Sequence, residues 1–120
     1  MNYSRYTSGV NDDNATKMQV VNGETFIVGY TTSPDFPVTN GSTYQGYYDI
    51  TVTKYSSNGT ILYSSYIGGN SYDECTSMKV INGEVYILGR TNSTNYPVTN
   101  GSVANGFIDI VVTKLFTNGS

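Results

Sequence analysis

The acidic and aromatic side chains are the residues of this chain that could carry chemistry. The chain has no histidine, so it can form neither a Ser-His or Cys-His nucleophile pair nor an HExxH zinc site. It also has no glycine-rich loop of the kind that cradles phosphates. Acidic pairs such as Asp12-Asp13 are adjacent in sequence, which does not place two carboxylates across a substrate. We therefore expect a protein that is not an enzyme and that uses no cofactor.

Two stretches rich in oxygen ligands, Asp12-Asp13-Asn14 and Asp73-Glu74, are the places where a hard cation such as calcium could bind. Neither has the spacing of an EF-hand loop. Asp13 and Asp73 are explained more simply as acceptors for the amides of nearby turns, a common use of aspartate. We therefore predict no metal site.

Tyrosine is the other abundant group, with 12 residues, while tryptophan is absent. Tyrosine faces combined with Asn and Asp hydrogen bonds are typical of a glycan-binding surface. The absence of tryptophan weakens this interpretation, because sugar rings often stack on tryptophan. The candidate ligand-binding residues are Asp12, Asp35, Tyr44, Tyr47, Tyr48, Tyr72, Asn95 and Tyr96.

Charge and hydropathy exclude several classes of partner. Six basic and nine acidic residues give a net charge of −3, with no basic cluster for nucleic acid or an anionic membrane surface. No apolar run is long enough to span a bilayer. The first residues, Met1 to Arg5, lack the apolar stretch of a secretory signal, so localisation is left open. The single cysteine, Cys75, stands where the first half of the chain has Ala15, and we interpret it as a small buried residue.

The chain is one unit written twice, and this repeat determines where those residues lie. Pro37-Val38-Thr39-Asn40-Gly41-Ser42 returns unchanged 60 positions later, and nearly half of all positions paired at that offset are identical. We divide the chain into a first repeat, residues 1–60, and a second repeat, residues 61–120. A short β-rich unit usually cannot bury its faces alone and repeats in order to stack.

Each repeat contains four predicted strands. In the second repeat we expect strands over 73–81, 84–90 and 108–115, and the strand that completes the first unit over 60–67. Asn82-Gly83 separates the first two strands, and Asn-Gly is the strongest short hairpin signal because a type I′ turn needs positive φ at both positions. Each unit is therefore predicted to be a four-stranded antiparallel meander. The connections 8–14, 31–47, 68–74 and 91–107 fall at the end opposite the tight turns, and we expect any ligand there.

The second and third strands of each unit are apolar on both faces. Val85 and Ile87 alternate with Tyr86 and Leu88, and the strand over 108–115 follows the same pattern. A sheet with one wet face would alternate between apolar and polar residues. Apolar residues on both faces indicate that neighbouring sheets cover both sides. In a repeated series this arrangement is a β-propeller, so we predict an all-β fold of propeller blades.

The residues also resemble a known family. The run LYSSYIGG, then YDECTSMKVINGEVYILGRTNSTNYP, then GFIDIVVTKL, is similar to the SBBP β-propeller repeat of bacteria and archaea. The shared features are a Tyr-rich strand ending in Gly-Gly, an acidic pair, a Tyr-Pro or Phe-Pro step and an Asp before a V-x-K strand. The resemblance covers both repeats and implies the propeller fold. It implies little about function beyond a setting in cell-surface or secreted proteins.

The repeat frame is offset from the predicted blades, which predicts self-association. The segment Tyr3–Tyr6 aligns with the fourth strand, so the second unit lacks that strand at its own end. We expect residues 2–8 of one chain to pair with residues 108–115 of a neighbour, head to tail, until a ring closes. We favour three chains and six blades, with four chains and eight blades next. The alternative is a fragment of a longer cell-surface propeller. The expected closure residues are Tyr3, Ser4, Tyr6, Ile108, Ile110, Val112 and Lys114.

Overall fold

The computed structural model describes residues 1–120 and shows an all-β protein with seven strands and no helix. The first sheet has the strand order β1-β2-β3-β4, all antiparallel. The second has the order β5-β6-β7. The strands are β1 (Asp13–Val21), β2 (Glu24–Thr31), β3 (Asp49–Tyr55), β4 (Ile61–Ile67), β5 (Asp73–Ile81), β6 (Glu84–Thr91) and β7 (Asp109–Leu115). The all-β expectation is confirmed, as is the strand order of the complete meander.

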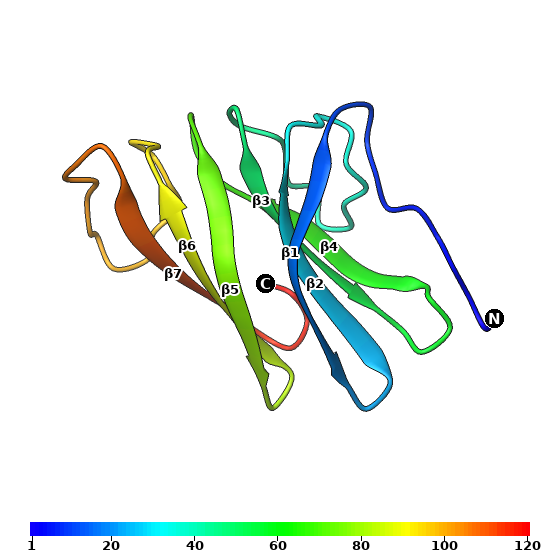
Figure 1. The fold of residues 1–120 in the computed structure, drawn as a ribbon. Coiled ribbons are helices and arrows are strands. Elements are labelled where there is room, and N and C mark those ends of the chain that lie inside the picture. Colours follow the sequence, from blue (N-terminus) through cyan, green and yellow to red (C-terminus); the bar gives the residue numbers. More distant parts are fainter.

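Both predicted Asn-Gly turns have the backbone that a type I′ hairpin requires. Asn22 and Gly23 have φ values of 51° and 80°, and Asn82 and Gly83 have 51° and 79°. These turns join β1 to β2 and β5 to β6 at one end of the molecule (Figure 1). The long connections gather at the opposite end, where the sequence places the candidate ligand residues.

The hydrophobic core lies between the two sheets, which stand side by side in Figure 1. The first sheet contributes alternate residues of β2 and β3, among them Val28, Ile50 and Val52, each with no exposed surface. The second sheet contributes Val85 and Ile87, which are also buried. Alternate side chains of a strand point to opposite faces, so these residues define one packed face on each sheet.

The N-terminal segment forms no strand within a single chain. Residues 1–12 contain no strand, although residues 2–8 are expected to form one with a neighbouring chain. A strand needs a partner for its main-chain N–H and C=O groups, and the single chain supplies none there. The structure contains no helix that is long and apolar enough to cross a membrane.

Beside a bulge in the first sheet, the main chain of β1 lies very close to Gly29 of β2. The register between β1 and β2 shifts between Ala15 and Lys17, which leaves Thr16 unpaired. A Cβ atom on Gly29 would overlap the carbonyl oxygen of Asn14. The thiol of Cys75 donates to the Gly29 carbonyl at 3.2 Å, so the same point also joins the two sheets. Any side chain at position 29 must therefore displace main chain.

Gly29→Ala is expected to destabilise the fold by about 1–3 kcal/mol, the usual cost of overpacking a tight site. Thermal or urea unfolding measures the change. Gly106→Ala is the matched control, because the nearest atom to a Cβ there lies at an ordinary 3.5 Å. Equal stability of the two variants would contradict the close approach at Gly29.

Candidate functional site

A cluster of tyrosines lies at the long-loop end, where the two sheets meet. The rings of Tyr47 and Tyr72 are stacked, with centroids 5.2 Å apart and 12° between their planes. Tyr48 packs against Tyr72 at 5.1 Å and meets Tyr30 edge-on at 5.2 Å. Tyr47 is 64% exposed and Tyr72 is 42% exposed. This tyrosine cluster therefore presents aromatic surface to solvent.

Main-chain contacts between the two repeats hold the tyrosine cluster in place. Tyr48 and Tyr72 form an isolated parallel bridge. The Asp73 N–H donates to the Tyr48 carbonyl at 2.8 Å, and the Tyr47 N–H donates to the Ser71 carbonyl at 3.2 Å. Gly46 permits this approach, because a Cβ there would lie 2.5 Å from the Ser71 carbonyl oxygen. The aromatic rings are thus fixed by backbone, which suits a preformed recognition surface.

The structure brings together Tyr44, Tyr47, Tyr48 and Tyr72 from the eight residues expected to bind a ligand. The Tyr44 hydroxyl donates to the carbonyl of Tyr47 at 2.8 Å. Asp12 is exposed and occupies in the first repeat the position of Tyr72 in the second, so it lies outside the cluster.

The other three expected ligand residues are engaged elsewhere. The side-chain oxygens of Asp35 and Asn95 accept hydrogen bonds from the backbone N–H groups of Val10 and Asn70, at 2.8 and 2.7 Å. These side chains brace the loops. Tyr96 is only 9% exposed and its hydroxyl is 2.8 Å from the Thr113 hydroxyl, so its ring belongs to the core and not to the loop surface. Burial raises the pKa of Tyr96 to about 12.

Four aspartates hold the connections that lead into strands. Each accepts a hydrogen bond from the backbone N–H four residues earlier, as expected for Asp13 and Asp73 from their turn positions. The donor and distance are Gly9 at 2.9 Å for Asp13, Gln45 at 2.7 Å for Asp49, Gly69 at 2.7 Å for Asp73 and Asn105 at 3.1 Å for Asp109. The spacing recurs in both repeats, so it is a structural element of the repeat.

Asp49 and Asp73 meet at the junction of the two sheets, and both are fully buried. They approach Gly68 from two sides, where a Cβ would lie 2.5 Å from Asp49 Oδ1 and 2.9 Å from Asp73 Oδ2. Asp73 is fully satisfied, whereas Asp49 Oδ1 has no hydrogen-bond partner. Burial raises the pKa of Asp49 to about 6, with a smaller contribution from the charge of Asp73. No three acidic or cysteine side chains converge as a metal-binding group.

Each sheet also has a second, open face. On the second sheet, Leu88, Ile110 and Val112 alternate with the buried residues of β6 and β7, so they share the face turned away from the first sheet. They are 42%, 79% and 71% exposed. We call Ile81, Tyr86, Leu88, Ile110 and Val112 the apolar patch of the second sheet. Several exposed apolar residues on one face of a sheet are typical of an interaction surface.

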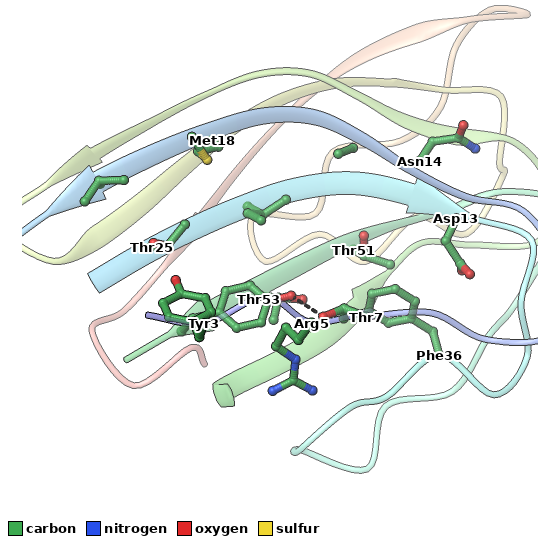
Figure 2. A pocket seen from close by; sticks show the side chains of 14 residues that line it. Tyr3, Arg5, Thr7, Asp13, Asn14, Met18, Thr25, Phe36, Thr51 and Thr53 are labelled. Carbon is green, nitrogen blue, oxygen red and sulfur yellow. Dashed lines mark hydrogen bonds between the residues drawn. The ribbon is translucent and has the colours of Figure 1, made fainter. Parts of the chain in front are cut away.

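The open face of the first sheet carries a pocket of about 510 Å³. Its floor is formed by sheet residues that include Met18, Val20 and Ile27. One wall comes from Tyr3, Arg5 and Thr7 of the N-terminal segment, which Figure 2 shows running beside the sheet. Half of the residues that line this pocket are hydrophobic.

Besides the hydrogen bond from Gly9 to Asp13, two contacts hold the N-terminal segment against β3 and the turn that follows it. Arg5 donates to the Gly59 carbonyl at 2.9 Å, and the Tyr55 hydroxyl donates to Thr7 at 2.7 Å. The expected closure residues at the other side of the molecule are exposed at Ile108, Ile110 and Val112, while Lys114 pairs with Glu84 at 2.9 Å. Tyr3, Ser4 and Tyr6 are exposed as well. The two segments lie on opposite sides of the chain (Figure 1), so one chain cannot pair them.

Comparison with known proteins assigns no family to this arrangement. A scan against protein-family models finds no match. A search of the curated proteins also finds none. The functional argument therefore depends on the geometry of the tyrosine cluster and of the two open faces.

Asp49→Asn is expected to stabilise the protein at pH 7 and to flatten its stability between pH 4 and 6. A carboxyl whose pKa rises on folding favours the folded state below its unfolded pKa of about 4, and that contribution is lost as the pH rises through about 6. A shift of this size corresponds to at most about 3 kcal/mol. Urea unfolding across this pH range measures it, and Asp109→Asn is the control, because Asp109 is the repeat equivalent of Asp49 but is only half-buried. A steeper pH dependence in Asp49→Asn than in the parent would contradict the assignment.

Proposed function

We propose that this chain is a non-enzymatic scaffold and recognition module of the β-propeller type that assembles with copies of itself, head to tail, into a closed ring. The two open faces carry this proposal, because each matches a face that the chain already buries. The resemblance of the repeats to the SBBP propeller family supports the same architecture. The site needs no catalytic group and no cofactor for this role.

Within one chain, the first sheet packs against the second, and we call this contact the junction inside the chain. We expect a similar junction between the second sheet of one copy and the first sheet of the next. Shifting the residues of the junction inside the chain by one repeat of 60 positions converts each buried face into an open one. Phe26, Val28, Ile50 and Val52 become Tyr86, Leu88, Ile110 and Val112, and Cys75, Met78, Val80 and Ile87 become Ala15, Met18, Val20 and Ile27. The residues of the second group lie on the second sheet, and their equivalents line the pocket on the first sheet. These eight positions stay apolar, whereas Val85 and Val111 become Thr25 and Thr51, so the apolar patch of one copy suits the mainly apolar floor of the pocket of the next.

The exposure of equivalent residues shows how much apolar surface is left uncovered. Ile50 is fully buried whereas Ile110 is 79% exposed, and Met78 is 5% exposed whereas Met18 is 63% exposed. Fully burying an aliphatic side chain contributes about 1.5–3 kcal/mol. Several such residues lie on each face, so covering both faces at once stabilises an assembly substantially. A single chain in water keeps them exposed.

The N-terminal segment contacts the first repeat in the same way that β4 contacts the second repeat. The ring of Tyr63, on β4, covers Gly119, where a Cβ would lie 2.6 Å from the ring. Its equivalent Tyr3 covers Gly59 in the same way, at 2.5 Å. The hydrogen bond from Gly9 to Asp13 likewise repeats that from Gly69 to Asp73. The N-terminal segment is therefore held where the fourth strand of a preceding blade would stand.

The partner strand for that segment is β7. In the first sheet β3 pairs with β4 along its length, whereas the equivalent strand β7 has one free edge. An exposed strand edge is a ready template for another chain. β7 of one copy would pair with residues 2–8 of the next and complete a four-stranded blade. Propellers hold 4–8 blades, so three copies give six blades and four copies give eight, and we favour three.

Ile110→Lys is expected to dissociate the assembly, because it places a charge on the apolar patch, at the position equivalent to the fully buried Ile50. Light scattering after size exclusion should give a multiple of the 13.1 kDa chain mass for the parent and a strongly reduced mass for the variant. Val103→Lys is the control, because this exposed loop residue belongs to neither face. A parent protein that is well folded at the mass of one chain would refute the assembly, and would agree with the fragment alternative.

The tyrosine cluster favours a second, compatible function, the binding of carbohydrate. Stacked and exposed rings with fixed backbone offer the flat apolar surface on which a sugar ring packs. A small pocket of about 190 Å³ adjoins it, lined by Tyr72, Glu74, Arg90 and Asn92 among others. Glu74 and Arg90 are paired at 2.8 Å and can exchange hydrogen bonds with hydroxyl groups. The ligand-binding proposal thus rests on four of the eight residues expected from the sequence.

Tyr72→Ala is expected to abolish binding to any glycan that the parent captures on a glycan array. Tyr72 packs against the rings of Tyr47 and Tyr48, so its removal takes away the stack as well as one surface. Phe107→Ala is the matched control, because Phe107 is the repeat equivalent of Tyr47 and is 95% exposed. An array without signal for the parent would remove the carbohydrate proposal and leave the scaffold proposal untouched.

A further inference from the structure

Three of the six basic side chains have no carboxylate partner, and two of them lie on the first strand of a sheet. Lys17 is on β1 and Lys79 is on β5. Lys17 donates only to the hydroxyl of Ser77, at 3.4 Å. The other four are engaged: Lys54 with Glu24 at 2.7 Å, Arg90 with Glu74 at 2.8 Å, Lys114 with Glu84 at 2.9 Å and Arg5 with the Gly59 carbonyl at 2.9 Å. In a propeller the first strands surround the central channel, so these two charges would gather there.

The junction inside the chain shows what lies beside Lys79 in an assembly. There Gln19 Oε1 accepts a hydrogen bond from the Val80 N–H, on the free edge of β5, at 2.9 Å. At the junction between copies, Lys79 takes the place of its repeat equivalent Gln19, and Val20 of the next copy takes the place of Val80. Gln19 supplies an acceptor for that N–H, but a lysine ammonium has no acceptor. The junction between copies therefore sets a positively charged donor against a peptide donor.

We propose that each junction between copies binds a small oxyanion of the phosphate class, held by the Lys79 ammonium of one copy and the Val20 N–H of the next. The inference rests on the proposed head-to-tail assembly, because the two donors come from different copies. An anion accepts from both groups at once, and hydrogen bonds between ionised partners are the stronger kind.

The surrounding charges favour this site. Glu84, which follows β5 after the turn, is already paired with Lys114. Asp73 and Glu74 lie at the opposite end of β5, and their carboxylates are engaged by Gly69, Ser93 and Arg90. Lys17 adds a second unpaired positive charge on the strand that carries Val20. The channel of a closed ring would therefore be lined by two unpaired lysines from every chain, although each chain has a net charge of −3.

The test is isothermal titration of the assembled protein with inorganic phosphate at fixed ionic strength and pH 7.5, with the mass measured on the same samples. The parent should bind about one phosphate per chain. Lys79→Gln should lower the affinity at least tenfold and keep the assembled mass, because glutamine restores the acceptor that Gln19 provides at the other junction. Lys54→Gln is the control, since it removes the same charge from an existing ion pair and should leave phosphate binding unchanged.

The outcomes separate this inference from the proposed function. An assembled parent that binds no phosphate, or equal affinity in the parent and Lys79→Gln, would overturn the anion site alone. A parent at the mass of one chain would overturn the assembly and the anion site together. Lys79→Gln should also raise the thermal midpoint of the assembly in phosphate-free buffer, because it exchanges a donor–donor contact for a hydrogen bond. A lowered midpoint would contradict the junction geometry.

Discussion

The packing of one sheet on the other is the interaction on which the rest of this structure depends. Val28, Ile50 and Val52 meet Val85 and Ile87 with essentially no exposed surface. A sheet that is apolar on both faces cannot stand alone in water, since each face needs a cover. One packed junction covers one face of each sheet. The open faces, the pocket and the proposed assembly all follow from that one constraint.

The strands and turns were predictable because their signals are local. Asn22-Gly23 and Asn82-Gly83 require positive φ, and the apolar alternation that follows them fixes which residues lie in the same strand. Tyr96 was misplaced for a different reason. A tyrosine in a polar loop has the composition of a surface residue, and only the fold shows that its ring enters the core beside Thr113. Asp35 and Asn95 were also expected to face a ligand, but their oxygens serve backbone groups 25 residues away.

The repeat itself contains a signal for the pocket. Met18 and Val20 recur as Met78 and Val80, and an apolar pair kept in both repeats indicates a face that is packed in both. The tyrosine cluster shows the opposite pattern. Tyr47, Tyr48 and Tyr72 become Phe107, Ile108 and Asp12 at the equivalent positions. Identical subunits would therefore form two kinds of junction, one with an aromatic cluster at its loop end and one without.

In such an assembly the two kinds of junction would also differ in strength. Val85 and Val111 of the junction inside the chain are replaced by Thr25 and Thr51 on the open face of the first sheet. Each exchange of a methyl group for a hydroxyl lowers the gain from burial and adds a polar group that needs a partner. The replacement of Gln19 by Lys79 removes one further hydrogen bond. An assembly of this chain would therefore separate between copies before the two sheets of one copy come apart, which allows each chain to fold first and to associate afterwards.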